Sequence, residues 1–232
     1  MYKLDNVSKS YNSLNVLKNF SVDIPEGKIT AILGPSGCGK TTILNLFAKL
    51  INPDQGQVDT ATKISYLFQE PRLIPWLSVK DNITLVLKDQ IQPVQRDNIL
   101  NRVAKATAIS AYLNYYPHQL SGGIKQRVAT ARAFAYQAPL LLMDEPFKSL
   151  DLKTRFKLIN DFYDLWQQEP NTVIMVTHDI KEALYLADQV LILSDKTSVI
   201  VEQLNLDLSK EERNDNEILQ TIEERIFKLM LS

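Results

Sequence analysis

The chain of 232 residues is long enough to bury a substantial core, and its length suits one large domain or one domain with an inserted lobe. Its 26 basic residues balance 27 acidic ones, so no global positive field exists to hold nucleic acid, and we expect no nucleic-acid partner. A single cysteine, Cys38, excludes an internal disulfide framework, and no apolar run approaches the roughly 18 residues of a spanning helix. These features predict a cytoplasmic protein that reaches a membrane only through a partner.

Strands and a helix alternate in the first third of the chain. Alternating and apolar runs predict strands within residues 2–33 and a further strand at 63–68. Between them, residues 41–50 predict a helix, with apolar side chains at helical spacing at Ile43, Leu44, Phe47 and Leu50. A strand, a glycine-rich turn and a helix therefore follow one another.

The rest of the chain changes its pattern twice. Helical spacing covers most of residues 78–137, with interruptions at Pro93 and Pro117, and we interpret this block as an inserted lobe. Beyond it, near-continuous apolar strands begin at residues 139, 171 and 189, and helices occupy 149–168 and 179–188. Such strands predict a mainly parallel sheet covered on both faces. An amphipathic helix follows residue 205, with apolar side chains at Leu219, Ile222, Ile226 and Leu229.

The run "GPSGCGKT" at residues 34–41 fits the pattern of a phosphate-cradling loop. Glycines let backbone N–H groups close around phosphates, Lys40 neutralises the β- and γ-phosphates, and Thr41 offers Mg²⁺ a hydroxyl ligand. The following helix adds its positive N-terminal end. A glycine turn with an incidental lysine is the alternative, but the position between strand and helix favours ATP binding. The residues expected to bind the nucleotide are Gly34, Pro35, Ser36, Gly37, Cys38, Gly39, Lys40, Thr41 and Thr42.

Two acidic residues close the apolar strand "LLLM". The carboxyl end of such a strand is where open sheets bind their ligands, so Asp144 is expected to hold Mg²⁺ and Glu145 to act as general base on the attacking water. In isolation the pair would more often mark a solvated turn. The phosphate loop upstream favours the catalytic interpretation.

Two further polar residues follow predicted strands. His178 comes after "TVIMVT" and is expected to face the γ-phosphate as a neutral imidazole. Gln69 closes "KISYLF" and is expected to reach Mg²⁺ or the attacking water. Without the other motifs, a structural histidine and a capping amide would be the better interpretations.

The run "LSGG" at residues 120–123 indicates a second phosphate-type site. Ser121 is a good N-cap, so a plain helix start is one interpretation, but a helix N-terminus with exposed N–H groups also binds anions. We expect Ser121, Gly122 and Gly123 to bind nucleotide. A single ATP needs both glycine runs only if they face each other.

The order of these motifs, with "SLD" at 149–151, resembles the nucleotide-binding subunit of ABC transporters over residues 2–203. This resemblance implies a homodimer that clamps ATP between the phosphate loop of one subunit and the LSGG of the other. It also implies that Tyr11 stacks on adenine and that Asp151 communicates across the dimer.

The implied fold is an α/β P-loop NTPase core with a mainly parallel sheet, an N-terminal antiparallel β region and an inserted α-helical subdomain. We expect a single domain over residues 1–232. Its parts are a core of 1–69 and 139–204, a helical subdomain of 70–138 that carries LSGG, and an amphipathic tail of 205–232.

A narrower likeness is visible in "FQEPRLIPWLSVKDNI" and "VTHDIKEALYLADQVLIL", which resemble importer ATPases for nitrate, sulfonate and taurine. This likeness implies an integral membrane permease and an extracytoplasmic solute-binding protein as partners, and a place on the inner face of the cell membrane. Lys148 departs from the small residue that is usual in the family, and Ile124 from glutamine or methionine; either could tune turnover.

The segment Glu70–Trp76 is expected to dock the permease, because it places apolar side chains between prolines that oppose regular structure. The alternative is that Trp76 covers the core of the lobe itself. A shift of this segment beside Gln69 could link the ATP state to transport.

Other ATPases share part of this motif set. A DNA-repair or chromosome-organising ATPase separates its halves by a long coiled coil, whereas only about a hundred residues lie between Lys40 and Asp144. A P-loop kinase of small molecules needs neither LSGG nor His178. An exporter stays open as an alternative, because an ATPase sequence does not choose the direction of transport, and the cargo is not written in the chain.

Overall fold

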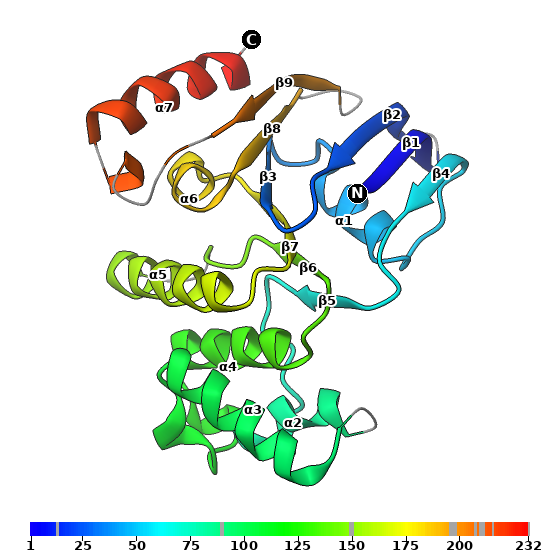
Figure 1. Ribbon diagram of the computed structural model, residues 1–232. Helices are drawn as coiled ribbons and strands as arrows, with labels where there is room; N and C mark the ends of the chain where they lie inside the picture. The colour runs from blue at the N-terminus through cyan, green and yellow to red at the C-terminus, as the bar shows by residue number, and fades with distance from the viewer. Residues whose placement is uncertain are drawn as a thin grey trace.

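The computed structural model describes residues 1–12, 14–88, 91–148, 151–194, 199–206, 208, 212–214 and 216–231. Figure 1 shows how its elements are arranged. The strands are β1 (Tyr2–Tyr11), β2 (Leu14–Ile24), β3 (Ile29–Leu33), β4 (Gln55–Asp59), β5 (Ile64–Leu67), β6 (Leu140–Asp144), β7 (Thr172–Thr177), β8 (Gln189–Leu193) and β9 (Ile200–Asn205). The α-helices are α1 (Lys40–Phe47), α2 (Val79–Thr84), α3 (Pro93–Ala106), α4 (Gly122–Ala135), α5 (Leu152–Gln168), α6 (Ile180–Leu186) and α7 (Asn216–Leu231). The 3₁₀ turns are η1 (Leu85–Leu87), η2 (Ser110–Tyr112), η3 (Pro117–Gln119) and η4 (Glu212–Asn214).

The central sheet orders its described strands as β5-β6-β7-β3-β8-β9, and among these only β9 runs antiparallel to its neighbour. A second sheet, β2-β1-β4, is antiparallel. Every residue of β3, β7 and β8 is buried, as in parallel sheets whose two faces are both covered. The expected mainly parallel sheet with an N-terminal antiparallel region is therefore confirmed.

The two faces of the central sheet have different covers. Successive side chains of a strand point to opposite faces, so Ala31 and Leu33 face one side of β3 and Ile32 faces the other. Ala31 and Leu33 share a hydrophobic core with residues of α4, α5 and α6. Ile32 belongs to a core with α1 and the antiparallel sheet. Helices α1 and α4 therefore lie on opposite sides of the sheet, as Figure 1 shows.

The expected helical lobe consists of α2, α3 and α4, which pack against one another. Its prolines begin helices instead of interrupting them. Pro93 is the first residue of α3 and Pro117 the first of η3. Proline suits a first helical position, because its missing N–H group would have no partner there and its φ angle is already helical.

The C-terminal region contains a strand that the sequence analysis did not predict. Strand β9 pairs antiparallel with β8 and has alternating half-buried and exposed residues, which is typical of an edge strand. The expected amphipathic helix follows as α7. Its Ile226 is buried in the core, while the adjacent Phe227 is exposed.

The helix after the phosphate loop is shorter than predicted. It ends at Phe47 and not near Leu50, because Lys49 adopts a left-handed conformation with φ 55° that breaks the helical path. Leu50 is consequently 60% exposed. Strand β4 was also not predicted; most of its side chains are exposed, so it lacks the apolar alternation on which the strand predictions rested. No helix in the described part of the chain is both long and apolar enough to cross a membrane.

Candidate active site

Four neighbouring strands end at one edge of the central sheet, where the candidate residues gather. Strand β3 leads into the glycine-rich loop, β6 into Asp144 and Glu145, and β7 into His178. Strand β5 ends just before Gln69. Carboxyl ends of parallel strands meet at one edge, and this edge is where open α/β sheets bind ligands.

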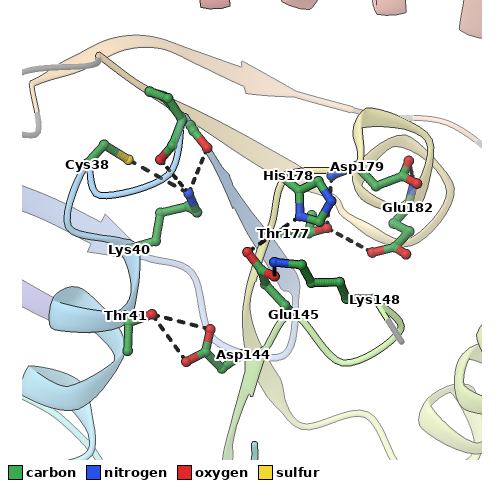
Figure 2. Close-up of polar contacts among 12 residues, drawn as sticks. Cys38, Lys40, Thr41, Asp144, Glu145, Lys148, Thr177, His178, Asp179 and Glu182 are labelled. Carbon is green, nitrogen blue, oxygen red and sulfur yellow. Dashed lines mark hydrogen bonds and ion pairs between the residues drawn. The ribbon is translucent and has the colours of Figure 1, made fainter. Parts of the chain in front are cut away.

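The glycine-rich loop wraps around the side chain of Lys40. Gly37 and Gly39 have φ angles of 85° and 101°, which strain any other residue. The buried Lys40 ammonium donates hydrogen bonds to the carbonyl oxygens of Gly34 at 2.7 Å and Pro35 at 2.8 Å, and its Nζ lies 3.9 Å from Cys38 Sγ (Figure 2). The loop thus holds one positive charge at its centre, beside the N-terminus of α1.

Thr41 and Asp144 bring a hydroxyl and a carboxylate together. The Thr41 hydroxyl donates to Asp144 Oδ2 at 3.2 Å, with Oδ1 at 3.4 Å (Figure 2). Burial raises the pKa of the Asp144 carboxyl, and the nearby Glu145 charge raises it further, against the Thr41 hydrogen bond. Hard oxygen ligands of this kind suit Mg²⁺, which often takes one or two protein ligands and completes its shell with substrate phosphates and water. The residues present therefore fit the ion.

No group of three His, Cys, Asp or Glu side chains gathers for a metal anywhere in the ranges that the structure describes. A divalent ion between Thr41 and Asp144 would therefore need oxygens from a bound nucleotide or water. This requirement is the usual one for Mg²⁺ in nucleotide sites.

Glu145 occupies a strained position at the end of β6. Its φ angle is 42°, which is rare for a residue other than glycine and is found at functional sites, and its backbone N–H donates to Val176 O at 2.9 Å. Its carboxylate forms an ion pair with Lys148 at 2.5 Å and lies 3.4 Å from His178 Nδ1 (Figure 2). Partial burial acts to raise the pKa of Glu145, but Lys148 and His178 outweigh it and hold that pKa below its ordinary value.

A buried network supports the segment that carries His178. The Thr177 hydroxyl donates to Glu182 Oε2 at 2.8 Å and accepts from the Asp179 backbone N–H at 3.1 Å, so hydrogen bonds flank the histidine on both sides. Arg155 of α5 donates to Asp179 Oδ2 at 3.0 Å. Burial raises the pKa of Glu182 to about 7. The side chain of His178 itself is half exposed.

The sequence analysis missed Glu182 and Arg155. A signal for Glu182 was present, because Asp179 caps α6 and an acid at the third helical position is typical of a capping box. Arg155 gave no local signal, since its partners lie 24 and 27 residues further along the chain.

Gln69 is exposed at the same edge of the sheet. It lies two residues beyond Leu67 of β5, which pairs with Met143 of β6, and Glu145 lies two residues beyond Met143. Equal spacing beyond paired residues puts Gln69 and Glu145 at corresponding ends of neighbouring strands.

The LSGG run lies at the start of α4, in the helical lobe. Ser121 is the N-cap of α4, and its hydroxyl accepts from the Ile124 backbone N–H at 3.4 Å. A Cβ added to Gly122 would meet no atom within 4 Å. Helices α4 and α1, which begin at the two glycine runs, cover opposite faces of the sheet.

Tyr11 and Asp151 also lie outside the group around Glu145. Tyr11 ends β1 with its ring 44% exposed and with Lys9 Nζ 5.8 Å from the ring centre. Asp151 caps α5 and accepts from the Thr154 backbone N–H at 3.1 Å. Ser149 and Leu150 of the "SLD" run lie outside the described residues.

Known proteins match this chain in sequence and in structure. A family model described as ABC transporter matches residues 17–148. The aliphatic sulfonates import ATP-binding protein SsuB of Zymomonas mobilis is 40% identical over 201 residues, which cover 82% of this chain and 81% of that protein. SsuB of Bacillus cereus is 36% identical over 231 residues, which cover 95% of this chain and 90% of that protein.

A solved dimeric ATP-binding cassette in a post-hydrolysis state, bound to ADP and Pi, matches with a TM-score of 0.78 and 32% identity. The match covers 90% of this chain and 100% of that chain. The chain therefore belongs to the ABC transporter family, as an ATP-binding subunit that hydrolyses ATP.

Proposed function

We propose that two copies of this subunit hydrolyse ATP at shared sites and thereby drive uptake of a small sulfonate-like solute through a separate membrane permease. The subunit would lie in the cytoplasm, peripheral to the inner face of the membrane, and a solute-binding protein outside the cytoplasm would deliver the cargo. The names of the sulfonate-import relatives support this class of solute, to which nitrate and taurine are the related alternatives.

The observation that carries the proposal is the separation of the two glycine runs. The phosphate loop and α1 cover one face of the sheet, whereas α4 begins at LSGG on the other. We infer that ATP bound to Lys40 does not reach Ser121 of the same chain, so that the exposed N-terminus of α4 would meet the phosphates held by a second copy. The dimeric cassette that matches this fold supports the same arrangement.

Each residue of the site has a proposed part in hydrolysis. The phosphate loop would bind the phosphates and Tyr11 would stack on adenine. Thr41, Asp144 and Gln69 would hold Mg²⁺, which supplies charge neutralisation when it is bound. Glu145 would take the proton of the attacking water, and His178, which lies 3.4 Å from Glu145, would contact the γ-phosphate. Asp151 would report on the site of the partner subunit.

The segment Glu70–Trp76 is the proposed docking surface for the permease. Polar side chains hold its backbone at two places. The half-buried Arg132 donates to the carbonyl oxygens of Pro71 and Arg72, and the buried Asn82 accepts from the Ile74 N–H and donates to the Ile74 carbonyl oxygen. Leu73 packs on the core, but Trp76 is 76% exposed, which excludes the alternative that Trp76 covers the lobe. A fixed backbone with an exposed aromatic is typical of an interface anchor.

A mixing experiment tests the shared site. Chains with Lys40→Ala and chains with Ser121→Arg should each be nearly inactive alone, because every site lacks one half. A mixture forms some heterodimers in which one site has a sound phosphate loop and a sound LSGG, so ATPase activity should recover in part. If heterodimers form, as shown by differently tagged chains, and no activity returns, the shared site is wrong.

A further inference from the structure

Lys148 contacts the side chain that we propose as the general base. Its Nζ lies 2.5 Å from Glu145 Oε2, while the other carboxylate oxygen, Oε1, lies 3.4 Å from His178 Nδ1 (Figure 2). Both oxygens of a mostly buried carboxylate therefore already face a nitrogen.

The turn that carries Lys148 is anchored on both sides. The Phe147 side chain is 1% exposed and packs edge-on against Phe162, with ring centres 6.2 Å apart. The carbonyl oxygen of Pro146 accepts a hydrogen bond from Gln126 of α4 at 2.7 Å. These contacts fix the backbone between Glu145 and Lys148.

Only the lysine side chain keeps freedom in this turn. Its side chain is 44% exposed, whereas that of Glu145 is 15% exposed. The ammonium can therefore reach the carboxylate or turn toward solvent without any change in the backbone. A long, flexible and well-hydrated side chain is suited to both positions.

We propose that Lys148 is a positioning residue that restrains ATP hydrolysis by occupying Oε2 of Glu145. This inference rests on the proposed role of Glu145 as base. In hydrolysis the water oxygen bonds to the γ-phosphorus, the water proton passes to Glu145, and the bond from the γ-phosphorus to the bridging oxygen of ADP breaks. The ammonium and the water compete for the same carboxylate, so Lys148 lowers the rate of this step and leaves ATP binding unchanged.

The test compares the steady-state ATPase kinetics of the purified subunit with those of Lys148→Ser and Lys148→Arg. Lys148→Ser should raise kcat about two- to fivefold, the range that a half-exposed ion pair can contribute, with KM unchanged. Lys148→Arg keeps the positive charge and should stay near the wild-type rate. Lys157→Ser, which removes an exposed lysine from α5, is the matched control and should change neither constant.

An unchanged or lower kcat in Lys148→Ser, in protein with a normal melting temperature, overturns the restraint. So does a rise of equal size in Lys157→Ser. Glu145→Gln in the same series separates this result from the proposed function. If Glu145→Gln is inactive and Lys148→Ser is not faster, only the role of Lys148 fails, whereas substantial turnover by Glu145→Gln removes the base itself and the inference with it.

Discussion

The two glycine runs of this chain differ in how much of their surroundings the chain itself supplies. The run at residues 34–41 encloses a buried lysine whose ammonium bonds two loop carbonyls, and Asp144 lies beside it. The run at residues 120–123 caps its own helix, and a Cβ added to Gly122 would meet nothing within 4 Å outside the backbone of that helix and the neighbouring residues. The chain itself therefore surrounds the first run with polar partners, whereas the second run is left exposed at the start of a helix. The proposed shared site explains this difference, because a second copy of the chain would complete the site at the run at residues 120–123.

The largest expected effect is that of a substitution at Glu145, on the side of the phosphate loop. Glu145→Gln should reduce turnover by about a hundredfold or more, because an amide of the same shape cannot take the proton of water. ATP binding should persist, and the variant should accumulate as an ATP-bound dimer. In this dimer the run at residues 120–123 would contact the ATP of the partner subunit. Single-turnover hydrolysis and size-exclusion chromatography with ATP measure the two effects. Near-normal hydrolysis by this variant would show that Glu145 is not the general base.

A paired comparison of ATP affinity would separate the two runs directly. Lys40→Ala should weaken ATP binding to the monomer by about tenfold or more, because it removes the charge that faces the phosphates. Ser121→Arg should leave that affinity unchanged, since the Ser121 hydroxyl caps its own helix and is proposed to meet the nucleotide of the partner subunit. Calorimetric titration at protein concentrations below dimerisation gives both values. Equal losses of ATP affinity in the two variants would mean that both glycine runs of one chain contact the same ATP.

A smaller effect concerns the network under His178. Burial holds the pKa of Glu182 at about 7 in the folded chain, above its unfolded value of about 4.5, so the folded state binds a proton that the unfolded state releases. The contribution of Glu182 to stability is therefore present below pH 4.5 and is lost as the pH rises through 7.

Glu182→Gln mimics the protonated carboxyl and should remove this loss. Urea unfolding from pH 5 to pH 8 should show a shallower fall in the free energy of unfolding for the variant than for the wild type. Titrating groups such as Asp144 affect both proteins alike, so the difference between the two curves isolates Glu182. Parallel curves would show that Glu182 is ionised in the folded chain.

The smallest effect on the isolated subunit is expected at Trp76. Because the side chain is 76% exposed, Trp76→Ala should change the melting temperature and the basal ATPase rate very little. It should nevertheless weaken binding to the copurifying permease and reduce solute uptake. Leu73→Ala is a contrasting variant, since Leu73 packs on the core and its truncation should lower the melting temperature. Normal permease binding by Trp76→Ala would show that Trp76 is not part of the docking surface.

Most of the fold could be predicted from the sequence, because its elements follow from local patterns. The apolar runs of β6, β7 and β8 are buried strands as expected, and the glycine-rich turn between β3 and α1 follows from residue types and their spacing. The elements that were missed or misjudged have weak local patterns. Strand β4 is mostly exposed, and the end of α1 depends on one left-handed residue, Lys49.

The motifs also predicted which residues would carry the chemistry. Lys40, Asp144, Glu145 and His178 were identified from their places at the ends of a loop or of strands, before any distance was known. The parallel order β6-β7-β3 then brings these ends to one edge. Local sequence places each residue at the end of its own strand or loop, whereas the order of the strands in the sheet is a property of the fold.

Only the tertiary structure decided how these groups act on one another. Lys148 reaches Glu145 because Phe147 is buried and turns the chain back, and Glu182 lies beneath Thr177 because α6 returns across the end of β7. The placement of α1 and α4 on opposite faces of the sheet is likewise a property of packing, since either helix would look the same in sequence on either face. Residue spacing determines contacts within an element, whereas contacts between elements depend on which faces the hydrophobic cores bury.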